Sequence, residues 1–142
     1  MLSPDYIVGI VDGEGSFTVY IKNPSSHAPT KRRVRAEPKF YLKLIERDKH
    51  ILNEMKKFFG CGKVYFQKDS RKNHQDCYRY EVANRTQIED TIIPFFKKYP
   101  LRLKSKKNDF LLFCRIVMAM KEKRHLTDSG LKMLFRVKKQ MH

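Results

Sequence analysis

Acidic residues are scarce in this sequence. Its 142 residues include 15 Asp and Glu against 31 Lys and Arg, which gives a formal net charge of +16 and an isoelectric point of about 9.9. An enzyme that acts on neutral metabolites has no need of such an imbalance, whereas a protein that binds a polyanion does. The shortage of acids therefore predicts a polyanionic partner, and a nucleic acid above all.

Long apolar runs are also missing. No stretch approaches the ~18 apolar residues that a membrane span requires. Met1 leads into structured sequence without a charged leader or an apolar segment. We therefore expect no membrane partner and no secretion. The protein is expected to be intracellular, in an organelle (chloroplast or mitochondrion) or in a prokaryotic cytoplasm, and the sequence does not decide between these.

Paired cysteines and zinc-ligand spacings are absent. Cys61, Cys77 and Cys114 are separated by 16 and 37 positions, so they form neither a CxxC pair nor an even set for disulfides. We expect reduced thiols. The histidines have no ligand spacing, which disfavours a zinc site; they are His27, His50, His74, His125 and His142.

The sequence is nevertheless that of a folded protein. Hydrophobic residues make up 41% of it and aromatic residues 12%, with six Gly and six Pro, so apolar surface is sufficient to offset the entropy of folding. There is no linker, low-complexity tract or sequence repeat. The length suits one domain, residues 1–142.

The first element is a helix over about 4–13. Ser3 can cap it, Pro4 suits the first helical position and Asp5 suits the first turn. Its apolar residues lie on nearly every side, so we expect it to be buried all round.

The remaining patterns alternate in period between 2 and 3.6. In chain order they predict a strand over 16–22, a strand over 39–45, a helix over 49–59 capped by Asp48 and ended by Gly60, strands over 63–67 and 78–82, a helix from the capping box at Thr86 to near Phe96, and helices over 108–123 and 127–140. This order predicts an α+β fold in which helices cover one face of a four-stranded antiparallel sheet. The other face is left open, with basic and aromatic side chains.

Two glycines stand out in the first helix. Gly9 and Gly13 lie four residues apart on one face, and each costs about 1 kcal/mol of helix propensity relative to Ala. Close packing against a second helix would compensate for that cost. Asp12 and Glu14 follow at the carboxyl end, where the helix dipole disfavours negative charge, so two acids there predict a cation. Mg²⁺ suits carboxylate, water and phosphate oxygens.

Residues 7–15, Ile-Val-Gly-Ile-Val-Asp-Gly-Glu-Gly, resemble the LAGLIDADG motif of homing endonucleases. The segments 103–106 and 125–131 also look like that family, so the resemblance covers essentially the whole chain. It implies the αββαββα homing-endonuclease fold, with a saddle-shaped four-stranded sheet and additional C-terminal helices.

The resemblance also implies roles for individual residues. Glu14 matches the catalytic carboxylate that binds the divalent metal, although the motif's name has Asp there. Asp12 matches the earlier acid, which we interpret as a cap or support in preference to a ligand. Lys104 matches a basic residue near the scissile phosphate, with a solvated basic loop as the alternative. Glu46 matches a polar residue that positions water.

The family's active site needs two motif helices, and this chain has one. The resemblance therefore implies a homodimer whose twofold axis runs between the two copies of this helix, with Ile7, Gly9, Ile10 and Gly13 at the interface. A nearly palindromic site follows. A strand of seven residues spans ~23 Å, which follows about seven base pairs in each half-site.

Period two assigns the DNA-reading side chains to the open face of the sheet. These candidates are Ser16, Thr18, Tyr20, Lys22, Lys39, Tyr41, Lys43, Tyr65, Gln67, Arg79 and Glu81. A basic run at 31–35, with Arg33 and Arg35, is interpreted as a loop that contacts phosphates, with a nuclear-localisation signal as the alternative.

The expected function is that of a site-specific endonuclease on double-stranded DNA. The resemblance implies that a metal-activated water would attack a phosphate and that both strands would break across the minor groove to leave 3′ overhangs. Two alternatives remain: an RNA maturase that binds intron RNA and assists group I intron splicing, and a DNA-binding module without catalysis. The presence of Glu14 favours cleavage.

Overall fold

The chain begins with helix α1 (Pro4–Glu14), as the sequence predicts. Ser3 Oγ accepts a hydrogen bond from the backbone N–H of Tyr6 at 3.2 Å, which satisfies one of the open donors of the first turn. Gly15 ends the helix in an extended conformation and starts the first strand. This computed structural model describes residues 1–24, 35–68 and 75–142.

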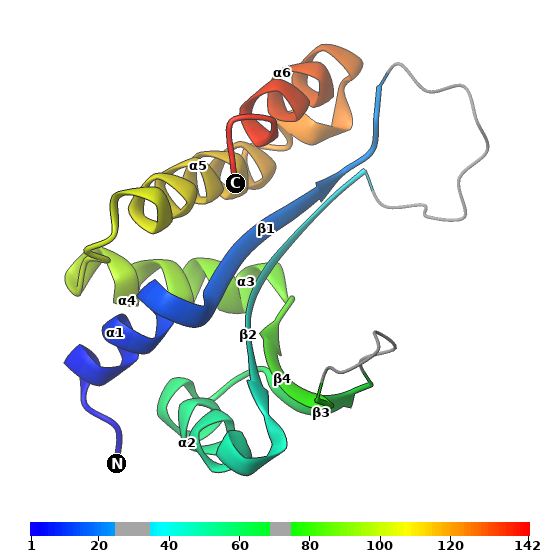
Figure 1. The fold of residues 1–142 in the computed structure, drawn as a ribbon. Helices are drawn as coiled ribbons and strands as arrows, with labels where there is room; N and C mark the ends of the chain where they lie inside the picture. Colours follow the sequence, from blue (N-terminus) through cyan, green and yellow to red (C-terminus); the bar gives the residue numbers. More distant parts are fainter. Residues whose placement is uncertain (25–34, 69–74) are drawn as a thin grey trace.

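Four strands form one antiparallel sheet in the order β1-β2-β4-β3 (Figure 1). They are β1 (Gly15–Ile21), β2 (Ala36–Ile45), β3 (Lys63–Gln67) and β4 (Cys77–Val82). Phe17 pairs with Phe40, and Phe40 pairs with Val82 on its other side. The predicted antiparallel sheet is confirmed, and Figure 1 shows β2 curving along its length.

Strand β2 begins at Ala36, three residues earlier than predicted. Proline is tolerated in a strand only where its missing N–H costs no ladder hydrogen bond. Pro38 pairs with Val19 of β1, whereas the pairing with β4 starts only at Phe40. On the β4 side Pro38 therefore has no neighbouring strand, so its missing N–H costs no hydrogen bond there and β2 can include the proline.

The helical segment after β4 consists of α3 (Arg85–Gln87), a π-helical turn (Ile88–Ile92) and α4 (Ile93–Lys98). Its cap is Asn84, whose Oδ1 accepts from the N–H of Gln87 at 3.0 Å, so the predicted capping box at Thr86 is wrong. Pro94 lacks the N–H for a regular helical hydrogen bond, which explains the wider turn before it.

Three further helices complete the fold. Helix α2 (Lys49–Phe59) ends at Gly60, which has the left-handed φ of 69° expected of a glycine cap. Asp48 occupies the predicted cap position but makes no side-chain cap hydrogen bond. Helix α5 (Lys104–Lys121) begins four residues earlier than predicted, and α6 (Asp128–Lys138) is capped by Thr127.

The core lies between the sheet and the helices (Figure 1). Phe17 of β1 packs its ring 5.1 to 5.5 Å from those of Phe40, Phe96, Phe110 and Phe113, which come from β2, α4 and α5. All five side chains are buried. Because the helices cover this face, the α+β prediction is confirmed and the other face is left for the polar side chains.

The described residues also bear on membrane-spanning helices and on the cysteines. Among the described residues, no helix combines the length and the apolar character needed to cross a lipid bilayer. Cys61, Cys77 and Cys114 are free thiols, and burial raises the pKa of Cys114 to about 11.

We expect Phe40→Ala to lower the free energy of unfolding by about 3–5 kcal/mol, because it removes the ring at the centre of this aromatic cluster and leaves a cavity. Phe66→Ala is the matched control. Phe66 is 50% exposed, and its ring lies 5.5 Å from that of Tyr78 between centroids. Its loss should therefore cost about 1 kcal/mol. Urea denaturation of both variants measures the difference, and equal losses would contradict the placement of the core.

Candidate functional site

Glu14 is the last residue of α1, and its side chain is exposed. No described residue makes a hydrogen bond or an ion pair with its carboxylate. A carboxylate at the carboxyl end of a helix is disfavoured by the helix dipole, so it gains from a nearby cation. The position predicted for the catalytic carboxylate is therefore accessible and available to a ligand.

Asp12, one turn of sequence before Gly15, is buried and has a different role. Its two carboxylate oxygens accept hydrogen bonds from the backbone N–H of Arg102, at 3.2 and 3.0 Å, and one of them accepts from the N–H of Leu103 at 3.3 Å. Leu103 is the cap residue of α5 and has no side-chain cap of its own. Asp12 thus supports the start of α5, as the interpretation of it as a cap predicts, but the helix that it caps is a distant one.

This support brings two lysines of α5 toward the end of α1. Lys106 Nζ donates a hydrogen bond to the carbonyl oxygen of Gly15, directly beside Glu14. Lys104, the residue predicted from the resemblance, opens α5 with its side chain exposed. Sequence reasoning missed Lys106. Lys104 and Lys106 are two residues apart, so on a helix they face different sides, and only the early start of α5 determines which of the two lysines faces α1. The local sequence does not show that early start.

Glu46 lies in a separate place. Gly15 pairs with Leu42, and β2 continues for three residues beyond that pair before Glu46 follows. Its side chain lines a hollow with Arg47, Gln75 and Asp76, and no residue of α1 lines it. Among the described residues no hydrogen bond or ion pair joins Glu46 to Glu14, and the water-positioning role of Glu46 stays a prediction.

One face of α1 is exposed, so the expected all-round burial is wrong within a single chain. Tyr6, Gly9, Ile10 and Gly13 form this exposed α1 stripe; Tyr6 is 45% exposed, Ile10 is half-buried, and a Cβ added at either glycine would meet nothing within 4 Å. Their spacing of i, i+3, i+4 and i+7 places them on one side of the helix. Ile7 does not belong to it: this side chain is 0% exposed, so its assignment to a partner interface is corrected to the core.

The sheet register places the predicted DNA-reading residues of the strands on the face opposite Phe17 and Phe40, as predicted. These are Ser16, Thr18, Tyr20, Lys39, Tyr41, Lys43, Tyr65, Gln67, Arg79 and Glu81. Lys22 follows β1, and its N–H donates to the carbonyl oxygen of Arg35. The Arg35 guanidinium lies 3.4 Å from Asp128 at the start of α6. Arg33 lies outside the described residues.

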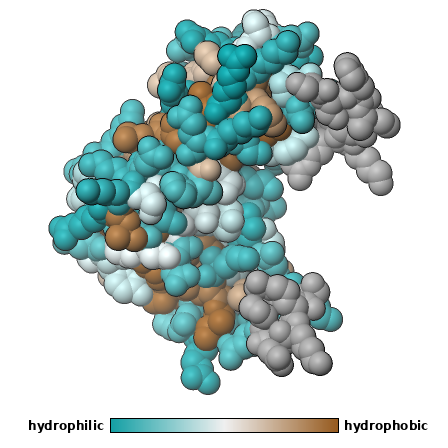
Figure 2. All heavy atoms as spheres, turned by 45° about the horizontal axis from the view of Figure 1, so that its top comes forward, coloured by the Kyte–Doolittle hydropathy of each residue, from teal (hydrophilic) through white to brown (hydrophobic). Residues whose placement is uncertain are grey.

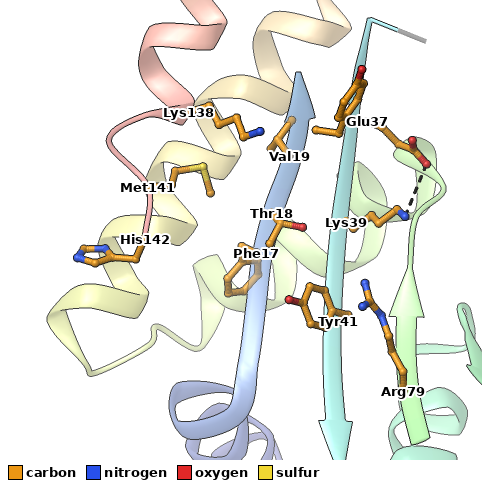
Figure 3. A pocket seen from close by; sticks show the side chains of 11 residues that line it. Phe17, Thr18, Val19, Glu37, Lys39, Tyr41, Arg79, Lys138, Met141 and His142 are labelled. Carbon is orange, nitrogen blue, oxygen red and sulfur yellow. Dashed lines mark ion pairs between the residues drawn. The ribbon is translucent and has the colours of Figure 1, made fainter. Parts of the chain in front are cut away.

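A hollow of about 410 Å³ opens on this face, over β1 and β2 (Figure 3). Thr18, Lys39 and Tyr41 line it from the sheet. Lys138 and His142, which follow or end α6, line it beyond the edge of β1, and sequence reasoning missed both. His142 is held there by its N–H, which donates to the buried Asp109 at 3.0 Å, a contact between distant residues that no local pattern reveals. Figure 2 shows that hydrophilic residues predominate over the surface in that view.

Glu81 is on the predicted face but is not available to DNA in the way predicted. Its side chain is only 7% exposed, its Oε1 lies 2.8 Å from Arg79 Nη2, and it accepts from the hydroxyl of Tyr65 at 3.2 Å. Burial raises the pKa of Tyr65, which keeps this hydroxyl protonated and able to donate. Glu81 therefore organises its neighbours, because it is nearly buried and its Oε1 contacts both Arg79 and Tyr65.

The expected divalent metal would need several side-chain ligands near Glu14. Among the described residues, no three His, Cys, Asp or Glu side chains gather closely enough to hold a metal ion. One exposed carboxylate, Glu14, is a hard oxygen ligand of the kind that Mg²⁺ accepts together with water and phosphate oxygens. The residues present therefore fit a divalent ion only if a phosphate and a second protein unit contribute ligands.

The four-stranded antiparallel sheet covered by helices on one face makes this an α+β protein, and comparison with known proteins gives the family. Residues 7–117 match the family model described as LAGLIDADG endonuclease. The chain therefore belongs to the LAGLIDADG endonuclease family.

Among curated proteins, a probable intron-encoded endonuclease 2 of Neurospora crassa is 35% identical over 133 residues, which cover 92% of this chain and 27% of that protein. The homing endonuclease I-ApeII of Aeropyrum pernix is 30% identical over 81% of this chain and 62% of its own length. The chain thus spans less than two thirds of either relative.

Two solved structures share the fold closely. The homing endonuclease I-TnaI has a TM-score of 0.81 and 37% identity, covering 99% of this chain and 88% of that one. The LAGLIDADG homing endonuclease I-SmaMI bound to cleaved DNA has a TM-score of 0.82 and 31% identity, covering 99% of this chain and 44% of that one.

We expect Asp12→Asn to lower the free energy of unfolding by about 1–3 kcal/mol, because one of two charged acceptors for the N–H groups of Arg102 and Leu103 is lost in a buried place. Asp5→Asn removes the same charge from the exposed first turn of α1 and should cost less than about 1 kcal/mol. Urea denaturation compares the two variants; a loss at Asp5 as large as that at Asp12 would contradict the supporting role.

Proposed function

We propose that this protein is a site-specific endonuclease that cleaves double-stranded DNA as a homodimer, on a long, nearly palindromic site. The observation that carries the proposal is the position of Glu14. This exposed carboxylate, which has no partner among the residues that the structure describes, lies at the junction of the exposed α1 stripe with a basic, open sheet face. Family membership supports the same activity.

Glu14 is the proposed ligand for a divalent metal such as Mg²⁺. When bound, such an ion lowers the pKa of a coordinated water and offsets negative charge on a phosphate. Lys106 donates to the carbonyl oxygen of Gly15, the residue after Glu14, so its ammonium group adds positive charge at this end of α1, where the phosphate would develop negative charge. Asp12 holds that lysine in place through the start of α5.

The exposed α1 stripe is the proposed contact between two copies. Without side chains at Gly9 and Gly13, two helix backbones can approach closely, and the packing buries Tyr6 and Ile10. A twofold axis through this contact brings the two copies of Glu14 together and doubles the number of carboxylates.

The same axis gives the form of the DNA site. Strand β1 has seven residues and spans ~23 Å, about the length of seven base pairs, so two sheets joined at the axis follow a long duplex. The two carboxylates would meet the strands across the minor groove, which leaves 3′ overhangs.

The first test is Glu14→Gln. Incubated with randomised duplex DNA and Mg²⁺, the unmodified protein should cut a defined sequence, and the variant should lose cleavage by at least about 100-fold, since the amide is a poor metal ligand. Binding to the same duplex should remain. Sequencing of the cut ends gives both the site and the overhang.

Glu54→Gln removes the same charge from α2, on the covered face of the sheet, and should cut normally. Cleavage by Glu14→Gln at the original rate would contradict the role of this carboxylate. Binding without cleavage in every variant would leave a DNA-binding module, and preferential binding of intron RNA would favour the maturase alternative.

The second test is Gly13→Gln. Since a Cβ there meets nothing within 4 Å, the folded chain should tolerate it and gain up to about 1 kcal/mol of stability from helix propensity. The bulky side chain should instead weaken dimerisation by at least about tenfold, because two helices can no longer approach closely. Analytical ultracentrifugation with and without duplex DNA measures this change. A dimer of unchanged affinity, or an unmodified protein that stays monomeric on DNA, would contradict the proposed interface.

A further inference from the structure

Four side chains on the open sheet face are joined to one another. Tyr41 comes from β2, Tyr65 from β3, and Arg79 and Glu81 from β4, and we call them the sheet-centre cluster. The Arg79 guanidinium carbon lies 3.6 Å from the centroid of the Tyr41 ring, and its Nη2 lies 2.8 Å from Glu81 Oε1. Tyr65 donates to the same carboxylate oxygen at 3.2 Å.

The cluster holds Arg79 from two directions. The ring of Tyr41 covers one face of the guanidinium, and Glu81 ties one of its edges. The side chain of Arg79 is only 15% exposed, whereas that of the neighbouring Lys39 is 29% exposed and lies 4.0 Å from its ion-pair partner Glu37 (Figure 3). Arg79 therefore loses little further conformational freedom when it binds a ligand.

Part of the guanidinium remains available. A guanidinium carries five N–H donors, and the contact with Glu81 uses one of them. The Nε of Arg79 is buried and has no hydrogen-bond partner among the described residues, so the donors open to a ligand are those of Nη1 and the remaining one of Nη2. The side chain lines the hollow over β1 and β2, so a ligand that enters there meets a positioned fork of donors (Figure 3).

The charge balance distinguishes a base from a phosphate as that ligand. The Glu81 carboxylate, 2.8 Å away, offsets the positive charge of Arg79, so a phosphate gains little attraction at this place. The uncharged edge of guanine presents two acceptors, O6 and N7, that match the fork. Glu81 itself is poorly placed to read a base, because its side chain is 7% exposed and its Oε1 already accepts from Tyr65 and lies against Arg79.

We propose that Arg79 determines specificity for one guanine in each half-site, read in the major groove, and that Glu81 acts as its positioning residue. This inference rests on the proposed function, since it assumes that duplex DNA lies over the open sheet face. It adds which residue reads a base, which base is read, and what holds the reader in place.

The test selects bound duplexes from a randomised library in the presence of EDTA, so that bound DNA stays intact. The unmodified protein should select guanine at one position of each half-site. Arg79→Gln should reduce that preference by roughly tenfold or more and shift it toward adenine, the base that Gln matches, with the other positions unchanged. Glu81→Gln should weaken the guanine preference at the same position without replacing it by another base.

Lys57→Gln is the matched control, because it removes one positive charge from α2 on the covered face and should leave every position unchanged. A guanine preference that survives Arg79→Gln would overturn the proposal, as would an equal loss of affinity for all sequences, which indicates a phosphate contact. Circular dichroism shows whether Arg79→Gln folds. If it does not, the double variant Arg79→Gln/Glu81→Gln, which removes both buried charges, is used for the selection instead, and it too should lose the guanine preference at that position. If the unmodified protein selects no sequence at all, the proposed function fails together with the inference, whereas failure at Arg79 alone leaves that function standing.

Discussion

The hydrogen bonds that Asp12 accepts from the N–H groups of Arg102 and Leu103 join two helices that are far apart in the sequence. Through them the carboxyl end of α1 supports the amino end of α5, where a helix leaves its first N–H groups without partners. Two needs are met at once: buried donors find acceptors, and the buried carboxylate finds donors. The same contact supports the start of α5, from which Lys106 reaches the carbonyl oxygen of Gly15 at the end of α1.

Helix α1 meets two different demands on its two sides. Ile7, Val8 and Val11 are buried in the chain's own core, whereas the exposed α1 stripe keeps two glycines that no contact in the chain requires. Glycine in an exposed helix position costs stability relative to Ala, so this cost is retained without a benefit inside one chain. The proposed contact with a second copy of α1 would supply that benefit, and it would also account for the apolar residues on nearly every side of α1.

The sequence predicts the elements well where the signal is local. The start of α1 at Pro4 and the end of α2 at Gly60 both depend on residues within one turn, and both are confirmed. The start of α5 could not be predicted, since its cap comes from Asp12, about 90 residues earlier. Lys106 was missed for the same reason.

The open sheet face shows a similar division between what a pattern decides and what packing decides. Period two correctly assigns the polar side chains to one face, yet it treats them as equivalent. The structure separates them: Glu81 is buried beneath Tyr65 and Arg79, whereas Lys43 on the neighbouring strand is exposed. Only the pairing of β4 with both β2 and β3 brings the four residues of the sheet-centre cluster together.

This difference bears on how such a face can recognise a long duplex. Exposed lysines keep many conformations and attract any phosphate, so they supply affinity that falls with salt and carries little sequence information. A guanidinium that is stacked and ion-paired before binding has lost most of that freedom, and its net charge is offset, so a mismatched base gains nothing from it. A face built from both kinds of side chain binds DNA in general through its periphery and discriminates between sequences at its centre, and a change in the exposed lysines would alter affinity without altering which base the centre accepts.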